Sequence, residues 1–410
     1  MITNKAQLDK PDTSKNVVVA ILVMATALSI MSTDMYAPSL PDLTGYFDTN
    51  ATMVKLTISL NLLAFGIAQL IHGPLSDRFG RRPVLLVSLF FVAVLCLACA
   101  FAQSIEQLIV ARVLLGLAAA AEAVVGFAII KDRFNEKEQV KVLALFGMVL
   151  AIAPAIAPIV GGYLHVHLGW QSNFFVLTGM AVLVWFVIFF HLSESATIDQ
   201  AALQPARLIS GYALHIGNLE FMVHSAMCGV AMGLIFVFVT GAPFVYIDML
   251  DVAVQHYGYY QALVVLAFFC GSLLASSVSD RMDHGRLLIG GNLIILMGAA
   301  MQVSFIALDL LTPIRLTVAQ AIMLFGMGPL FAVAPSRAMR SVHQQTGSAS
   351  ALLSGIENSA AAVAAIMISV MHDGTAYPMA WVSLFLSASL LLLLYHSRRA
   401  THISNLRVDG

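Results

Sequence analysis

Long apolar runs alternate with short polar segments along almost the whole chain. Twelve of these runs approach or exceed the length of about 20 residues that a helix needs to cross a bilayer. They cover roughly residues 17–38, 54–74, 83–101, 107–130, 139–164, 171–191, 219–246, 257–279, 287–308, 313–335, 348–371 and 380–396. Because backbone polar groups find no water inside a membrane, each run is expected to be helical. The pattern predicts an all-α integral membrane protein with twelve transmembrane helices.

The composition agrees with this fold class and narrows the functions. Of 410 residues, 60% are apolar and only 10% are charged, unlike a soluble domain. A net charge of −1 without a basic patch gives no reason to expect a nucleic-acid partner. The run at 17–38 is too long for a signal-peptide core and contains Asp34, so we expect it to stay uncleaved. The four cysteines lie in apolar runs, where buried thiols are expected rather than a metal or redox centre, and we expect no cofactor. They are Cys96, Cys99, Cys228 and Cys270.

The basic residues predict the orientation in the membrane. If the N-terminus is cytoplasmic, eighteen of the 21 fall in segments on the cytoplasmic side. These are Lys5, Lys10, Lys15, Arg78, Arg81, Arg82, Lys131, Arg133, Lys137, Lys141, Arg207, Arg281, Arg286, Arg337, Arg340, Arg398, Arg399 and Arg407. Only Arg315 falls in an outer loop, while Lys55 and Arg112 lie within helices. Positive residues favour the cytoplasmic side, so both termini are expected there.

The chain also divides into two similar halves. Ser76-Asp77-Arg78, at the end of the second helix, is repeated as Ser279-Asp280-Arg281 at the end of the eighth. Parallel repeats of six helices are a known transporter arrangement. We therefore predict an N-terminal tail (1–16), a six-helix bundle (17–191), a linker (192–216), a second bundle (217–396) and a C-terminal tail (397–410), both tails cytoplasmic.

One stretch is distinctive enough to suggest a family. Residues 66–86 read GIAQLIHGPLSDRFGRRPVLL. Gly73 and Pro74 are expected to close a helix, and the charged residues after them to lie in a short loop. The residues GPLSDRFGRRP closely resemble the signature between the second and third helices of the major facilitator superfamily. Gly66 and Gln69 make the stretch most similar to the Bcr/CflA group of drug:proton antiporters.

This resemblance implies a fold, an activity and a location. The fold would be two pseudo-symmetric six-helix bundles, and the activity proton-coupled export rather than enzymatic catalysis. The partners would be a small-molecule substrate, protons and the lipid bilayer of a bacterial inner membrane, with the chain acting as a monomer. Conformational roles are implied for Gly73 and for a charge cluster that stabilises the outward-open state. The cluster comprises Asp77, Arg78, Arg81 and Asp132.

Charged residues inside the membrane are the main candidates for chemistry. A carboxylate there costs about 2.5–3.5 kcal/mol, so Asp34 is expected to face a cavity or a partner. Arg112 of the fourth helix lies at similar depth and needs an anion nearby, for which Asp34 is the obvious candidate. The alternative is that Asp34 is a helix-end carboxylate already in water. The resemblance implies proton coupling for both residues.

Glu122 is the second acid within the membrane and departs from the family pattern. It lies about 15 Å further along its helix than Arg112 and about 80° around it. Relatives tend to have a small residue there, so Glu122 suggests either proton coupling and a preference for cationic substrates or a structural hydrogen bond. Tyr36, Asn61 and Glu122 are the candidate groups of the substrate cavity.

Two further motifs suggest moving helix contacts. The fifth helix contains APAIAPIVGG, with Pro154, Pro158, Gly161 and Gly162 on a kinked, narrow face that resembles the antiporter motif of exporters. In the eleventh helix, Glu357 lies among small residues. Since that helix is expected to pack against the second, a structural or gating role for Glu357 is weighed equally with proton transfer.

These observations predict a proton-driven exporter of small lipophilic compounds that works by alternating access. The principal alternative is a dedicated exporter of one endogenous metabolite, such as a siderophore or an amino-acid derivative. An importer is disfavoured by the fifth-helix motif. A membrane enzyme is disfavoured because we find no nucleophile–base pair or metal cluster, and a sensor because the tails are short.

Overall fold

The computed structural model describes residues 14–279, 281–342 and 346–408. The predicted N-terminal tail lies almost entirely outside the described residues, and so does Asp280 of the repeat. Twelve helices in the described part of the chain are long and apolar enough to span a membrane, which confirms the predicted fold class.

Each half of the chain supplies six of these spans. The first half has α1 (Lys15–Asp34) with η1 (Ala37–Ser39) and α2 (Leu40–Tyr46), then α3 (Ala51–Phe79), α4 (Arg81–Ala100), α5 (Ile105–Arg133), α6 (Glu136–Leu168) and α7 (Gln171–His191). The second half has α9 (Leu219–Pro243) with η2 (Phe244–Met249), then α10 (Val254–Val278), α11 (His284–Ala307), α12 (Pro313–Arg340), α13 (Thr346–Val370) and α14 (Tyr377–Val408). Between the halves lies α8 (Pro205–Ile216).

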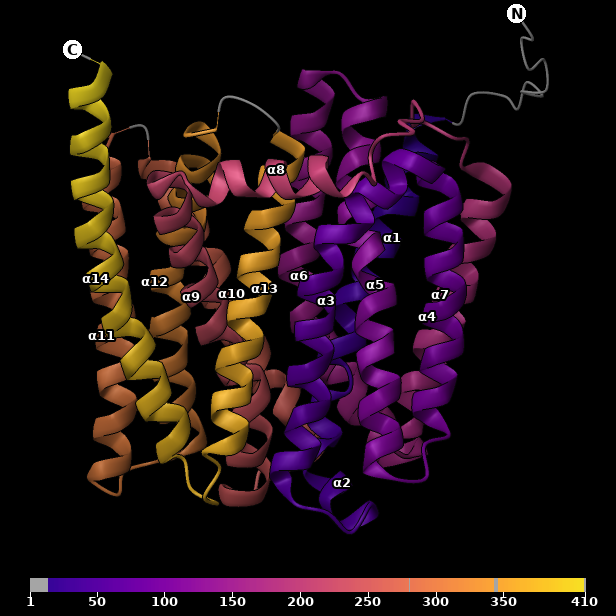
Figure 1. Cartoon of the computed structure of the whole chain (residues 1–410). Coiled ribbons are helices and arrows are strands. Elements are labelled where there is room, and N and C mark those ends of the chain that lie inside the picture. Colours follow the sequence, from indigo (N-terminus) through magenta and orange to yellow (C-terminus); the bar gives the residue numbers. More distant parts are fainter. Residues whose placement is uncertain (1–13, 280, 343–345, 409–410) are drawn as a thin grey trace, which may run out of the picture.

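The two halves stand side by side as separate bundles (Figure 1). Each bundle packs around its own buried apolar cluster, one built almost wholly from residues 18–192 and the other from residues 221–394. The helix α8 lies across one end of the molecule, where α14 also ends, and α2 lies at the opposite end (Figure 1). We call these the α8 end and the α2 end. The helix α14 continues to Val408, so it runs past residue 396, where we expected a tail.

The second spanning helix does not end at Pro74, as the sequence suggested. The helix α3 continues through Pro74 to Phe79, and Asp77 and Arg78 therefore lie in its last turns rather than in a loop. A proline inside a helix leaves the carbonyl of the residue four positions earlier without its usual N–H donor. That carbonyl belongs to Leu70, and it accepts a hydrogen bond of 2.7 Å from the Tyr212 hydroxyl of α8. A side chain from the linker thus satisfies the group that proline exposes.

The linker is more ordered than its polar sequence implied. Pro205 begins α8, at a position where proline suits a helix. Ile209 and Leu214 are exposed, whereas Gly211 and His215 are buried against the bundles. The helix is therefore amphipathic and lies flat at the α8 end.

Candidate functional site

The first spanning helix breaks at Asp34, earlier than the predicted end at residue 38. After Asp34 the chain passes through Met35 and Tyr36 into η1. Pro38 explains the break, because it has no N–H to donate to the Asp34 carbonyl. The last carbonyls of α1 are therefore free to accept hydrogen bonds from other groups.

Arg112 uses one of these carbonyls. Its side chain is fully buried, and its Nη1 donates to the Ser32 carbonyl oxygen over 2.8 Å. The guanidinium also lies 5.2 Å from the ring centre of Tyr36 and 6.0 Å from that of Phe174. The C-terminal end of a helix carries partial negative charge, and aromatic ring faces attract cations, so both features stabilise the arginine.

This geometry corrects the predicted ion pair between Asp34 and Arg112. Arg112 forms no ion pair in the described part of the chain, because no carboxylate oxygen lies within 4.0 Å of its nitrogens. The carbonyl end of α1 takes the place that we assigned to the Asp34 carboxylate. Asp34 itself is buried, with 7% of its surface exposed. Two guanidinium nitrogens of Arg112, Nε and Nη2, are buried and find no partner among the residues that the structure describes.

The two other cavity candidates of the first half are already engaged. The Asn61 amide donates to the backbone carbonyl of Arg112 over 2.6 Å, which ties α3 to α5. The Tyr36 hydroxyl lies 3.1 Å from the Thr57 hydroxyl of α3. Both residues therefore hold the surroundings of Arg112 in place, an arrangement that the sequence did not reveal.

Glu122 is buried in α5, with only 1% of its surface exposed. Neither of its carboxyl oxygens has a hydrogen-bond partner in the described residues, so the structural hydrogen bond that we considered is not present. A buried polar group without a partner is costly and is often found where a ligand binds.

The motif that we predicted in the fifth spanning helix lies in α6, between the end of α1 in its own half and α10 in the other half. A Cβ atom on Gly161 would lie 1.8 Å from the Met35 carbonyl oxygen, and one on Gly162 would lie 2.8 Å from that of Val254 in α10. A Cβ atom on Gly258 of α10 would lie 2.4 Å from the Ile159 backbone nitrogen of α6. The Pro154 carbonyl, whose usual donor is replaced by Pro158, accepts a bond of 3.5 Å from the Gln261 amide of α10. The predicted narrow face is therefore the surface on which α10 packs.

The second close contact between the halves joins α3 to α13. The Asn358 amide donates to the Gln69 side chain over 3.0 Å, and Gly66 and Gly355 let the two backbones approach. Glu357 is half-buried and lies beside the Cys228 thiol of α9, within its own half. The polar contact expected at this position is thus made by Asn358 and not by Glu357.

The predicted charge cluster forms at the α8 end. Arg81 Nη1 lies 2.6 Å from the Asp77 carboxylate, and Arg81 Nε lies 3.1 Å from that of Asp132. Arg78 instead donates to the Gln200 carbonyl of the linker. Gly73, one turn earlier in α3, faces Val124 of α5 and makes no polar contact of this kind. The cluster therefore joins α3, α4, α5 and the linker.

We expect the Arg81–Asp132 pair to contribute little to stability. A double-mutant cycle with Arg81→Met and Asp132→Asn should give a coupling free energy of about 0.2–1 kcal/mol, because surface ion pairs are screened by water. The measurement is thermal or denaturant unfolding in detergent. The matched control is the Lys15–Glu138 pair, 2.7 Å apart and more exposed, which should couple more weakly. A coupling above about 2 kcal/mol would contradict this expectation.

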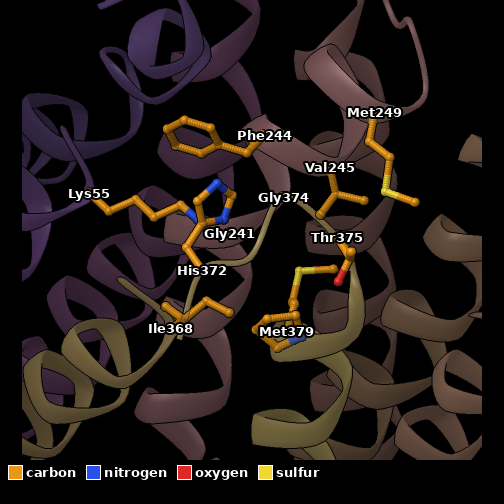
Figure 2. A pocket seen from close by; sticks show the side chains of 11 residues that line it. Lys55, Gly241, Phe244, Val245, Met249, Ile368, His372, Gly374, Thr375 and Met379 are labelled. Atoms are coloured by element: carbon orange, nitrogen blue, oxygen red, sulfur yellow. The ribbon is translucent and has the colours of Figure 1, made fainter. Parts of the chain in front are cut away.

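Three residues that we did not single out join the halves at the α2 end. Figure 2 shows Lys55 of α3 pointing toward His372, which follows α13, with Phe244 of η2 close by. Lys55 Nζ and His372 Nδ1 are 2.7 Å apart, and Lys55 Nζ lies 4.5 Å from the Phe244 ring centre. The only signal in the sequence was a lone lysine within an apolar run.

Comparisons with known proteins agree with this architecture. Residues 22–365 match the family model of the Major Facilitator Superfamily. The uncharacterized MFS-type transporter YdgK of Bacillus subtilis is 28% identical over 379 residues, covering 91% of this chain and 93% of YdgK. The multidrug transporter MdfA of Escherichia coli O157:H7 is 28% identical over 308 residues, 75% of each chain.

A solved structure extends the likeness to the fold. The xylose transporter XylE from Escherichia coli, in a partially occluded inward-open conformation, matches with a TM-score of 0.72 at 13% identity. The match covers 93% of this chain and 97% of XylE. The predicted resemblance is confirmed: this chain belongs to the Major Facilitator Superfamily and is a membrane transport protein, not an enzyme.

Proposed function

We propose that this transporter exports small lipophilic compounds across a bacterial inner membrane in exchange for protons. Membership of the superfamily and the likeness to a multidrug transporter support export of drug-like compounds. The observation that carries the proposal is Arg112, a fully buried guanidinium at the broken end of α1, two of whose nitrogens have no partner in the described part of the chain. Buried ionisable groups in membrane helices commonly mark ion or substrate pathways.

The α8 end faces the cytoplasm in this proposal. It carries the arginines of the α3–α4 turn, the start of α1 and the C-terminal end of α14 (Figure 1). The positive-inside rule supports this orientation, because sixteen of the 21 basic residues fall in described segments that reach that end. The α2 end is then the outer end, and both termini are cytoplasmic.

Proton coupling is assigned to Asp34 and Arg112, with Glu122 as the second candidate. When Asp34 is ionised, its carboxylate competes with the Ser32 carbonyl for Arg112, two residues away along the end of α1. Protonation removes that competition and leaves Arg112 with the helix end. Each state favours a different position of η1, which packs against α6 and α10, so a proton shifts the balance between conformations.

The proton gradient suffices for such an exchange by alternating access. A membrane potential of 100 mV supplies about 2.3 kcal/mol per charge. One pH unit adds about 1.4 kcal/mol. Together they support an outward gradient of several hundredfold for a neutral compound exchanged for one proton.

Glu122 is the group that we assign to the substrate cavity. Its two carboxyl oxygens have no hydrogen-bond partner among the described residues, whereas Tyr36 and Asn61 already have partners. A cationic compound would supply the positively charged partner that the buried carboxylate needs. We therefore propose that Glu122 favours cationic over neutral substrates, and that Tyr36 and Asn61 shape the cavity through Arg112.

Everted vesicles energised to be acid inside test the proposal directly. Adding several unrelated neutral and cationic drugs should release protons, read with a pH-sensitive dye, and Asp34→Asn should abolish the release. Glu122→Gln should weaken the proton release caused by cationic drugs. It should not change the release caused by neutral drugs. Release that survives Asp34→Asn would move the coupling acid to Glu122. No release with any drug, once expression is verified, would instead favour a dedicated exporter of one metabolite.

A further inference from the structure

At the outer end, the two halves are joined by a hydrogen bond between two ordinarily basic side chains. Lys55 at the start of α3 and His372 after α13 lie 317 positions apart in the sequence, yet their nitrogens are 2.7 Å apart. The Thr52 hydroxyl also donates to the Ser369 carbonyl over 3.0 Å, so α3 and α13 are in direct contact there. The bond is therefore part of a closed contact between the halves.

This hydrogen bond requires a particular protonation state. A Lys55 ammonium can only donate, so His372 Nδ1 must accept, and only a neutral imidazole has a nitrogen that accepts. The pair thus carries one positive charge. A second proton on His372 would remove the acceptor and place two positive charges at hydrogen-bond distance. The contact would then be repulsive.

The surroundings offset that repulsion only in part. Lys55 is 2% exposed, and Phe244, whose ring it faces, is buried with the apolar core of the first half. Lys55 forms no ion pair in the described part of the chain, because no carboxylate oxygen lies within 4.0 Å of its Nζ. Asp248 and Asp373 act on Lys55 electrostatically without forming an ion pair with it.

Two of the acidic groups at this end also bind other residues. Asp373 accepts hydrogen bonds from the Thr375 amide and hydroxyl, at 2.9 and 2.6 Å. Asp42 of α2, which faces Asp248, lies 2.6 Å from His165 of α6. Asp373 therefore offsets a second proton on the lysine–histidine pair only in part, because partial burial and the Lys55 charge oppose that proton more strongly.

We propose that Lys55, His372 and Phe244 form a proton-sensitive latch that holds the outer end closed, and that protonation of His372 from outside releases it. The proposal rests on the alternating access proposed above. His372 is a positioning residue here: it controls when the outer end opens, and it does not carry the exchanged proton. An acidic exterior would thus open the path that leads protons to Asp34.

The sign of the pH dependence follows from the location of His372. Partial burial and the Lys55 charge lower the pKa of His372 while the latch is closed, and together they outweigh the Asp373 charge, which raises it. Once the halves separate, both causes vanish and the pKa returns toward the ordinary value of about 6.5. The open state therefore binds the proton more tightly. As the pH falls below about 6.5, the open:closed ratio should rise by up to tenfold per pH unit, until the lowered pKa is reached.

Distances across the outer end provide the test. Spin labels on cysteines introduced at Gln103 and Leu308, both exposed on outer loops of opposite halves, report the separation in lipid nanodiscs. Every variant carries Cys270→Ala, because Cys270 is exposed, and Asp34→Asn, so that titration of Asp34 cannot contribute. Between pH 8 and pH 5.5, the population with the longer distance should grow, by up to about tenfold in this background.

Three substitutions separate the latch from a general effect of acid. His372→Asn keeps an acceptor near the position of Nδ1 but cannot be protonated in this range, so its distances should not change with pH. His372→Arg should show the long distance even at pH 8. The matched control is His256→Asn, which removes an exposed outer histidine and should respond like the parent.

Two results would overturn the latch. One is a parent whose distances do not change with pH, and the other is a His372→Asn variant that changes as the parent does. Neither would count against drug–proton exchange, which the vesicle assay tests through Asp34. Lys55→Met provides a second check, because without the lysine charge the pH response should shrink even where His372 is intact.

Discussion

Replacing Gly258 by alanine should reduce transport by about fivefold to more than a hundredfold while each half stays folded. A Cβ atom on this residue would lie 2.4 Å from the Ile159 backbone nitrogen of α6, where no flexible side chain can move aside. The two helices must therefore separate. Overpacking of this kind costs about 1–3 kcal/mol or more. Since the contact is between the halves, the cost falls on the state in which the outer end is closed.

Transport in everted vesicles and the spin-label distance between the outer loops would measure this effect. The control is Gly147→Ala, in α6, where an added Cβ would meet nothing within 4 Å. That change should leave transport intact and stabilise the helix by about 0.5–1 kcal/mol. Equal activity of Gly258→Ala and Gly147→Ala would show that the α6–α10 contact is not needed for the cycle.

Replacing Arg112 by methionine should abolish coupled transport and at the same time raise stability. The arginine is fully buried, and two of its nitrogens have no partner in the described residues. Replacing buried charged groups by apolar ones of similar size is often neutral or stabilising by about 1–4 kcal/mol. Natural proteins keep such costly groups where function requires them. We therefore expect opposite signs for activity and stability.

Proton release in vesicles would measure the loss of transport, and unfolding in detergent would measure the gain in stability. The control is Arg112→Lys, which keeps the charge but replaces the planar, multiply donating guanidinium with a compact ammonium. It should lose most transport without the gain in stability. A methionine variant that is less stable than the parent would show that Arg112 is primarily structural, held by Ser32, Tyr36 and Phe174.

Much of the fold could be predicted because its signals are local. The length of each apolar run determines a span, so twelve spans were predicted and twelve are present in the described residues. Errors arose where a distant group supplies what the local sequence lacks. Pro74 looked like a helix end, yet α3 continues because Tyr212, far along the chain, bonds to the exposed Leu70 carbonyl.

The candidate site shows the same difference between local signals and contacts made by distant residues. The sequence by itself determined that Asp34, Arg112 and Glu122 lie within the membrane, because a charge inside an apolar run is visible without a structure. Only the tertiary structure decided that Arg112 bonds to the end of α1 rather than to Asp34. It also decided that Lys55 meets His372. Such contacts depend on where separate helices are placed relative to one another, and that placement results from packing summed over the whole interface rather than from any single residue.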